Sequence, residues 1–288
     1  MSLDVVRAWY CRMAIVTIAL ALFAGCGSEE DGPWSSDGIA WEDEDETPTL
    51  RSGGGGGEPS VACTSVDILQ SYDDVDSLRN TQLINALRHR IKSKHQAISY
   101  DNAKKYMFNA KNGIDVREGS IECIYTGDLY SPQKLDQNDG FNTEHSWPQS
   151  MFGSEPNVAK GDMHHLFPAE RDMNTCRGNY PFGETKKPDN SAKCVRGGSK
   201  RGISVTSSER VFEVRPQYRG DIARAQFYFA VRYGLKISAE QEEVLRAWHE
   251  QDPPDDIECV RNHAIESYQN NRNPFIDRPE FVNYIADF

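Results

Sequence analysis

The sequence predicts an α+β fold: a mostly helical single domain with a few short strands, spanning about residues 63–288. Apolar residues recur every three to four positions in several segments, whereas strand-like segments are few and short. In addition, 10% of the residues are aromatic, and the apolar residues are distributed through the domain. This composition is typical of a chain that builds a packed core.

Helices are expected in six segments. The first begins near Thr81, and its apolar residues Leu83, Leu87 and Ile91 share one face. The others cover residues 99–110, 169–177, 221–233 with Asp221 as cap, 238–252 with a capping box at its start, and 257–268. Residues 221–233 are apolar nearly all round, which predicts a buried helix. Strands are expected at residues 122–126, at 162–167 where Pro168 would end the strand, and at 209–214.

Residues 1–25 have the pattern of a signal peptide. Arg7 and Arg12 precede a mainly apolar run, residues 13–23, which as a helix would rise only about 16 Å, too little to cross roughly 30 Å of hydrocarbon. The ending Ala24-Gly25-Cys26 resembles a bacterial lipobox. This resemblance predicts that Cys26 carries a lipid anchor that tethers the protein to a membrane. The alternative is ordinary signal cleavage with release of the protein. Residues 26–60, acidic and rich in glycine, are expected to form a disordered tether.

The net charge of −12 is unusual for a protein that binds nucleic acid, but the charge is unevenly distributed. Residues 1–59 contain 3 basic and 11 acidic residues, which leaves 29 basic and 33 acidic residues for the rest of the chain. Because local distribution decides phosphate binding, the total does not exclude a nucleic-acid substrate.

Five cysteines remain once Cys11 in the signal segment and Cys26 are set aside. Export permits disulfides, and an odd number leaves at least one free thiol in a monomer. We expect a Cys176–Cys194 disulfide, because it would tie a loop back onto the helix 169–177. No CxxC spacing is present, so a structural zinc site is not expected.

The candidate catalytic residues lie between residues 141 and 179. Glu144 and His145 are adjacent, and neighbouring side chains in a regular strand face opposite ways, so a shared site requires a strand end, a bulge or a turn. Asn174 and Arg177 share a helical face. Glu and Asn oxygens favour Mg²⁺, with Mn²⁺ or Ca²⁺ as alternative ions. A neutral imidazole can take a proton from water, and a guanidinium can bind phosphate, the role inferred for Arg177.

Three motifs together resemble the bacterial endonuclease I family: Asn142-Thr-Glu-His-Ser-Trp-Pro148, Asp162-Met-His-His-Leu-Phe-Pro168 and Asn174-Thr-Cys-Arg-Gly-Asn179. The resemblance covers roughly residues 75–288. It implies an extracellular or periplasmic nuclease with a ββα-metal, or His-Me finger, active site. It also implies that His145 is the general base and that Glu144 and Asn174 hold one Mg²⁺. Other members have Asn at the position of His165, so no role is assigned there.

The resulting hypothesis is a largely sequence-nonspecific, metal-dependent endonuclease that acts as a monomer on DNA, with RNA left open. Residues 186–201 carry six cations and one acid; Lys193, Arg196, Lys200 and Arg201 are candidate phosphate contacts, and a merely solvated loop is the alternative. Two other hypotheses are a nucleic-acid-binding protein without catalysis and a zinc hydrolase that uses His164 and His165. For Arg272 and Asn273, a structural corner is favoured over a substrate contact.

Overall fold

The computed structural model describes residue 63, residues 71–132 and residues 140–288. The predictions for the signal peptide, for the tether and for lipidation of Cys26 lie outside the described residues. Within them, no helix combines the length and the apolar character that crossing a membrane requires.

Helices dominate the described chain, as the sequence predicts. The α-helices are α1 (Asn80–Lys94), α2 (Tyr100–Phe108), α3 (Pro156–Lys160), α4 (Arg171–Arg177), α5 (Arg219–Tyr233), α6 (Ala239–Gln251), α7 (Asp256–Gln269) and α8 (Pro274–Asp277). Short 3₁₀ turns are η2 (Gln149–Met151), η3 (Met163–His165), η4 (Ala192–Cys194), η5 (Pro216–Tyr218) and η6 (Pro279–Tyr284). Ser99 and Ser238 cap α2 and α6 with their side chains, as expected. Helix α5 begins two residues before the predicted cap Asp221.

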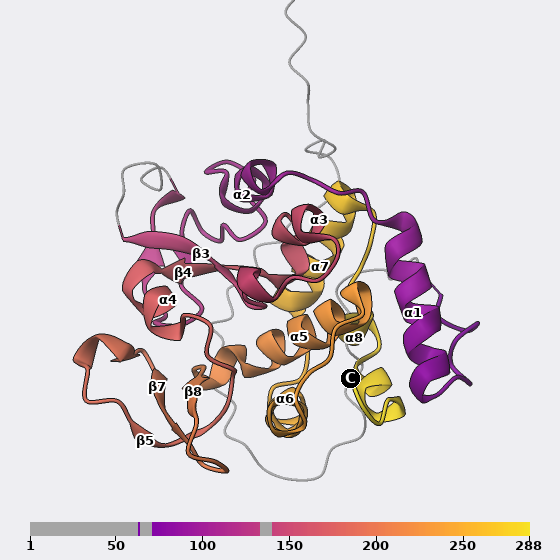
Figure 1. Cartoon of the computed structure of the whole chain (residues 1–288). Coiled ribbons are helices and arrows are strands. Elements are labelled where there is room, and N and C mark those ends of the chain that lie inside the picture. The colour runs from indigo at the N-terminus through magenta and orange to yellow at the C-terminus, as the bar shows by residue number, and fades with distance from the viewer. Residues whose placement is uncertain (1–62, 64–70, 133–139) are drawn as a thin grey trace, which may run out of the picture. The chain divides into compact units, whose positions relative to one another are not determined.

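Helix α5 is the buried centre of the helical part (Figure 1). It packs against α1, α6, α8 and η3, and nearly all of its side chains are buried, as its apolar circumference predicts. Its Phe229 ring stacks on Trp147, with 5.2 Å between ring centroids, and lies 4.4 Å from the ring of His165. Thus α5 provides the apolar support behind the segment that carries the candidate site.

Strands β3 (Phe141–His145) and β4 (Leu166–Glu170) pair antiparallel, and α4 follows β4 directly. The strand expected at 162–167 is therefore wrong in position: residues 163–165 form η3, and β4 runs through Pro168. The Pro168 carbonyl accepts a hydrogen bond from the Ile124 N–H at 3.0 Å. Because the N and C=O of a strand residue point to the same side, the missing N–H of Pro168 faces away from β3 and breaks no β3–β4 bond.

A second sheet contains β5 (Thr185–Pro188), β6 (Val195–Arg196), β7 (Ser199–Ser204) and β8 (Arg210–Glu213), with β7 paired to the other three. The basic segment, residues 186–201, for which a solvated loop was one alternative, is therefore partly a sheet. Strand β8 confirms the strand predicted at residues 209–214. The strand expected at 122–126 shrinks to β1 (Ile121–Glu122), which pairs with β2 (Leu129–Tyr130).

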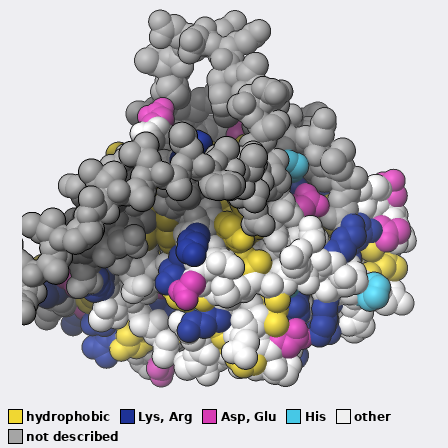
Figure 2. Space-filling view, turned by 90° about the horizontal axis from the view of Figure 1, so that it is seen from above, with side chains coloured by type: hydrophobic (Ala, Val, Ile, Leu, Met, Phe, Trp, Pro, Cys, Tyr) yellow, Lys and Arg dark blue, Asp and Glu magenta, His cyan; other side chains and the backbone are white. Residues whose placement is uncertain are grey.

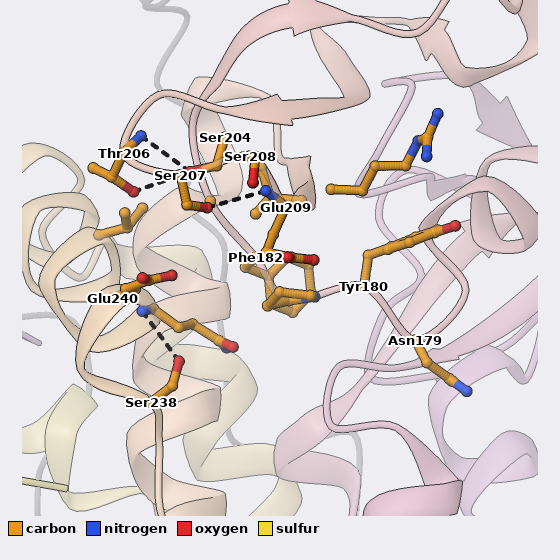
Figure 3. A pocket seen from close by; sticks show the side chains of 16 residues that line it. Asn179, Tyr180, Phe182, Ser204, Thr206, Ser207, Ser208, Glu209, Ser238 and Glu240 are labelled. Atoms are coloured by element: carbon orange, nitrogen blue, oxygen red, sulfur yellow. Dashed lines mark hydrogen bonds between the residues drawn. The ribbon is translucent and has the colours of Figure 1, made fainter.

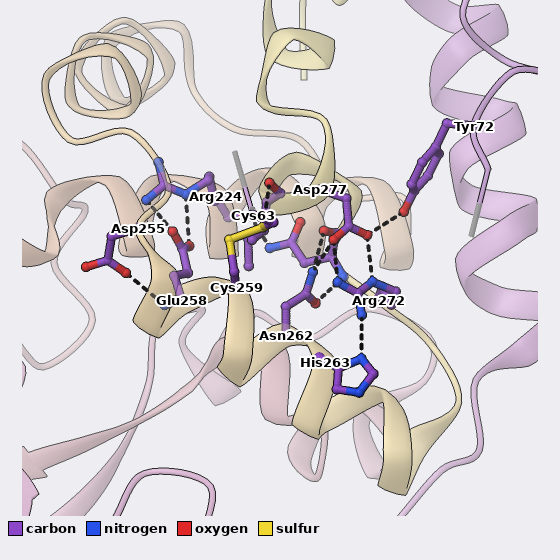
Figure 4. The surroundings of a disulfide bond; sticks show 12 residues. Cys63, Tyr72, Arg224, Asp255, Glu258, Cys259, Asn262, His263, Arg272 and Asp277 are labelled. Carbon is purple, nitrogen blue, oxygen red and sulfur yellow. Dashed lines mark hydrogen bonds and ion pairs between the residues drawn. A yellow bond between two sulfur atoms is a disulfide. The ribbon is translucent and has the colours of Figure 1, made fainter. Parts of the chain in front are cut away.

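Two disulfides close the fold. Cys176–Cys194 forms as predicted, and Cys63–Cys259, at a sequence separation of 196, was not anticipated. Among the described cysteines Cys123 is free and buried. Close to Cys63–Cys259, buried Arg272 pairs with Asp277 at 2.6 Å (Figure 4). Asn273 caps α8, so the structural reading of this corner is confirmed.

Candidate active site

Glu144 is a buried carboxylate near the end of β3. Its side chain is 2% exposed, and Oε1 lies 3.2 Å from Nε of Arg177. No described group donates a hydrogen bond to this oxygen. Burial raises the pKa of Glu144 to about 7, although the charge of Arg177 and the hydroxyl of Tyr125 lower it. The site therefore holds a buried acid whose pKa stays raised although the Arg177 guanidinium lies beside it.

His145, the last residue of β3, is held as a neutral imidazole. Its Nε2 lies 3.2 Å from the carbonyl oxygen of Lys160, and a carbonyl can only accept, so Nε2 carries the proton. The lone pair is then on Nδ1, which faces the Gln149 amide at 3.2 Å. Burial lowers the pKa of His145 to about 3, with further contributions from His165 and nearby cations. The ring is therefore uncharged throughout the neutral pH range.

Asn174 and Arg177 reach β3 from α4. The Asn174 amide makes a weak hydrogen bond to the carbonyl of Thr143 at 3.5 Å, which leaves its own oxygen as a potential ligand. Arg177 is buried; Nη1 donates to the Gly178 carbonyl at 2.8 Å and Nη2 to the Ser146 carbonyl at 2.5 Å. Its guanidinium faces Glu144 and the backbone, a positioning contact that the sequence did not predict.

The unit β3–β4–α4 thus brings Glu144, Asn174 and Arg177 together, while His145 contacts partners in η2 and α3. Strand alternation explains this division. Sequence reasoning missed Gln149 and the Lys160 carbonyl. A backbone oxygen carries no residue-type signal, and a lone glutamine near Trp147 has no distinctive spacing.

His164 and His165 are structural in the described chain. Their Nε2 atoms lie 3.1 Å from the Asn271 carbonyl and 2.7 Å from the Ala159 carbonyl, and burial lowers the pKa of each to about 4. No group of three or more His, Cys, Asp or Glu side chains suited to a metal occurs among the described residues. The zinc-hydrolase alternative therefore receives no support from the geometry.

Asp162 connects the site segment to the helices behind it. Its oxygens accept bonds from the hydroxyls of Tyr228 and Tyr233 on α5 and from Gln269 on α7, at 2.8–2.9 Å. Burial works to raise its pKa, but the facing histidines and the Gln269 bond hold the pKa well below its usual range. This satisfied buried carboxylate fixes η3, which leads directly into β4.

The four predicted phosphate contacts all have carboxylate partners. Lys193 faces Asp172 at 4.0 Å, Arg196 faces Asp128 at 2.9 Å, Lys200 faces Glu213 at 3.2 Å, and Arg201 faces Asp189 at 2.5 Å. On the face seen in Figure 2, Lys and Arg side chains are likewise interspersed with Asp and Glu. A phosphate would have to compete with these carboxylates.

One cavity, of about 350 Å³, lies beyond the end of α4, between Tyr180, the turn Ser204–Arg210 and the start of α6 (Figure 3). Within the turn, Ser204 Oγ accepts the Thr206 N–H at 3.1 Å and Ser207 Oγ accepts the Glu209 N–H at 3.2 Å. Glu209, Glu240 and Arg210 contribute charged side chains to the lining. Neither Glu144 nor His145 lines it. The cavity is therefore separate from the candidate catalytic residues.

Comparisons with known proteins agree with the geometry. The family model described as Endonuclease I matches residues 79–280. An extracellular ribonuclease of Bacillus amyloliquefaciens is 32% identical over 78% of this chain and 81% of its own length. One from Bacillus subtilis (strain 168) is 34% identical over 73% and 74%. A periplasmic deoxyribonuclease of Aeromonas hydrophila is 39% identical over 43% and 51%. The chain therefore belongs to the endonuclease I family and is a nuclease that hydrolyses phosphodiester bonds.

Proposed function

We propose that the protein is an exported, metal-dependent endonuclease of low sequence selectivity that cleaves DNA and RNA. The observation that carries this proposal is the β3–β4–α4 unit, in which Glu144, His145 and Asn174 lie on adjoining elements. Relatives named extracellular ribonuclease and periplasmic deoxyribonuclease support export and both substrate classes.

The residues at this unit fit a hard divalent cation. Oε1 of Glu144 is buried without a hydrogen-bond donor, and the Asn174 oxygen remains uncommitted when its amide donates to Thr143. We therefore assign Glu144 and Asn174 as the ligands of one Mg²⁺ that keeps several waters, with Mn²⁺ or Ca²⁺ as alternatives. When bound, such an ion stabilises charge that develops on the phosphate and leaving oxygen.

His145 is the proposed general base. The Lys160 carbonyl fixes its protonated nitrogen, so Nδ1 can take a proton from the attacking water. In the absence of substrate the Gln149 amide donates a hydrogen bond to this lone pair, and the attacking water can take the place of Gln149. A phosphate near the ring raises the pKa of His145 from its low resting value and makes it a stronger base. The main role proposed for Arg177 is to position Glu144 and not to bind the substrate phosphate.

Substrate contacts are proposed to be made mainly to phosphates, because no described element has the form of a base-reading helix. Lys193 and Arg196, 77% and 42% exposed, are the most accessible of the four basic-segment cations. Lys200 and Arg201, which are more buried, contribute less. We also propose a monomer with lipid on Cys26; mass analysis of the exported chain against Cys26→Ser tests the anchor.

Digestion of supercoiled plasmid and of single-stranded RNA, each with Mg²⁺ and with EDTA, tests the function directly. We expect internal cleavage of both nucleic acids with Mg²⁺ and none with EDTA. Undiminished cleavage in EDTA would refute the metal assignment. Absence of cleavage of either substrate with Mg²⁺, Mn²⁺ or Ca²⁺ would refute the proposed activity.

A further inference from the structure

An open groove of about 740 Å³ lies between α2 and the start of β3. Tyr100, Lys104 and Lys105 line it from α2, and Asn142 and Thr143 line it from β3. Thr143 precedes Glu144 in the chain, and the Tyr100 ring lies 5.1 Å from the ring of His145. This α2–β3 groove therefore runs alongside the strand that carries both proposed catalytic groups.

One lysine of this groove lacks the described carboxylate partner that each candidate cation of the basic segment has. Lys105 forms no ion pair with a described carboxylate, and Lys104 pairs only with exposed Asp101, at 2.9 Å. The amine of Lys160, at the end of α3, lies 5.3 Å from the Tyr100 ring centre and adds a third positive charge. Exposed pairs such as Lys104–Asp101 are weak and exchange readily for a phosphate.

Neutral donors add to the lining, which also includes Asp101 and the apolar residues Phe108 and Phe141. The side-chain oxygen of Asn109 accepts the Lys111 N–H at 2.9 Å, and that of Asn142 accepts the Thr143 N–H at 2.8 Å. These bonds orient each amide so that its NH₂ group is left for an acceptor. Lysines and amide donors together match the oxygens of a phosphodiester backbone, which accept and carry negative charge.

We propose that the α2–β3 groove binds the phosphodiester backbone of one nucleic-acid strand next to the cleavage site. Lys104 and Lys105 contact phosphates, and the amides of Asn109 and Asn142 donate to phosphate oxygens. This inference rests on the proposed function, because its ligand is the substrate of that site. It assigns most of the electrostatic binding to α2 instead of the basic segment.

Salt dependence of binding tests the groove. The probe is a fluorescein-labelled, mixed-sequence 20-nucleotide single-stranded DNA, measured by anisotropy in EDTA between 50 and 200 mM KCl. Lys104→Gln/Lys105→Gln should make the slope of log K against log salt shallower by about 1.4, the value for two lost phosphate contacts. The loss of affinity across this salt range then becomes about sevenfold smaller than in the unmodified chain.

The charge-matched comparison is Lys193→Gln/Arg196→Gln, which should change the slope less because carboxylates already pair these cations. A groove variant whose slope matches the unmodified chain, or shifts no more than the comparison pair, overturns the proposal. Lys105→Glu, a single exposed change checked by circular dichroism, provides a second test, and an unchanged slope there also overturns it. Mg²⁺-dependent plasmid cleavage by the unmodified chain tests the nuclease proposal separately.

Discussion

At the scale of single residues, the site depends on two ionisable groups whose pKa values burial moves in opposite directions. Glu144 becomes a weaker acid, with a pKa of about 7, and His145 a weaker base, with a pKa of about 3. Both shifts have the same cause, since removal from water disfavours the charged form of either group. The pair is therefore uncharged in much of its resting population near pH 7, and a cation is the partner that converts Glu144 to its charged form.

Substitutions at these residues should separate the base from the metal site. We expect His145→Ala to lower cleavage by ~10²–10⁴-fold, the usual value of a positioned proton transfer, with metal affinity preserved. Glu144→Ala and Asn174→Ala should instead weaken metal binding, because each removes an oxygen ligand. Metal titration and plasmid cleavage on all three, with circular dichroism as the folding control, make the distinction. Loss of metal by His145→Ala with normal cleavage at saturating Mg²⁺ would reverse the assigned roles.

Arg177 should behave as a positioning residue. Arg177→Met leaves the buried Glu144 carboxylate unpaired, and breaking a buried pair in this way is typically worth about 3–5 kcal/mol of stability. The expected signature is weaker metal binding together with a lower unfolding free energy, measured by urea denaturation at pH 8. Full stability combined with a shallower salt dependence of DNA binding would instead identify Arg177 as a phosphate contact.

At the scale of elements, α4 is short and depends on its connections. Seven-residue helices are marginal alone. The Glu170 side chain caps α4 by accepting the Met173 N–H at 2.7 Å, and Gly178, at φ 53°, ends it in a conformation that suits glycine. Between Asn174 and Arg177, Cys176 is bonded to Cys194. The position of the Asn174 amide, the proposed metal ligand, therefore depends on a disulfide only two residues further along α4.

Removing each disulfide in turn should separate these effects. Cys176→Ser/Cys194→Ser should weaken metal affinity, because α4 loses its tie, and lower stability by about 3 kcal/mol. Cys63→Ser/Cys259→Ser is the matched control: it should lower stability by about 5 kcal/mol for its longer loop while metal affinity stays the same in the folded protein. Equal loss of metal affinity in both variants would show only general destabilisation.

Elements whose signals are local were predictable from the sequence. The Ser99 and Ser238 caps and the apolar circumference of α5 are written within a few neighbouring residues. Strands β5, β6 and β7 were missed because their pairing is non-local and their residues are mostly polar, whereas β8, which contains buried Val211 and Phe212, was predicted. The position of β4 was predicted wrongly because Pro168 was expected to end a strand. Whether a proline interrupts strand pairing depends on whether its missing N–H faces the partner strand, here β3.

At the candidate site, too, non-local contacts could not be predicted from the sequence. Glu144, His145 and Asn174 are candidates chosen by residue type and order, and the structure places the first two on β3 and the third on α4. The inward orientation of Arg177, by contrast, follows from the Ser146 and Gly178 carbonyls, which no sequence pattern records. Cys63–Cys259 joins residues 196 positions apart, and pairing at such distance cannot be deduced from spacing.

At the scale of the whole molecule, buried neutral histidines make the fold sensitive to acid. Burial lowers the pKa of His145 to about 3 and those of His164, His165 and His249 to about 4. Their unfolded value is near 6.5, so below that pH the unfolded chain binds protons that the folded chain does not. Their stabilisation is complete above pH 6.5 and is lost as the pH falls through 4. Glu144 has the opposite effect on stability, because its raised pKa lets the folded chain bind a proton in this pH range that the unfolded chain does not bind.

Each of these histidines should therefore lower the unfolding free energy by about 1.4 kcal/mol per pH unit between pH 6.5 and 4, while the raised pKa values of Glu144, Asp221, Asp252 and Glu258 act in the opposite direction. Urea denaturation followed by circular dichroism at half-unit pH steps measures this slope. His249→Gln removes one of the titrating groups outside the site and should flatten the slope by about 1.4 kcal/mol per pH unit. A slope that His249→Gln leaves unchanged would contradict the neutral burial of this histidine.

The Cys63–Cys259 bond has a mechanical consequence. Cys63 is the first described residue, and its sulfur is attached to the first turn of α7. A pulling force that arrives along the preceding chain is therefore transmitted into α7 through a covalent bond, and α1 carries none of it. While the bond is intact, the chain between the two cysteines, whose extended length is roughly 700 Å, cannot be drawn out. Only residues 260–288, about 100 Å when extended, lie beyond the cross-link and can lengthen under load.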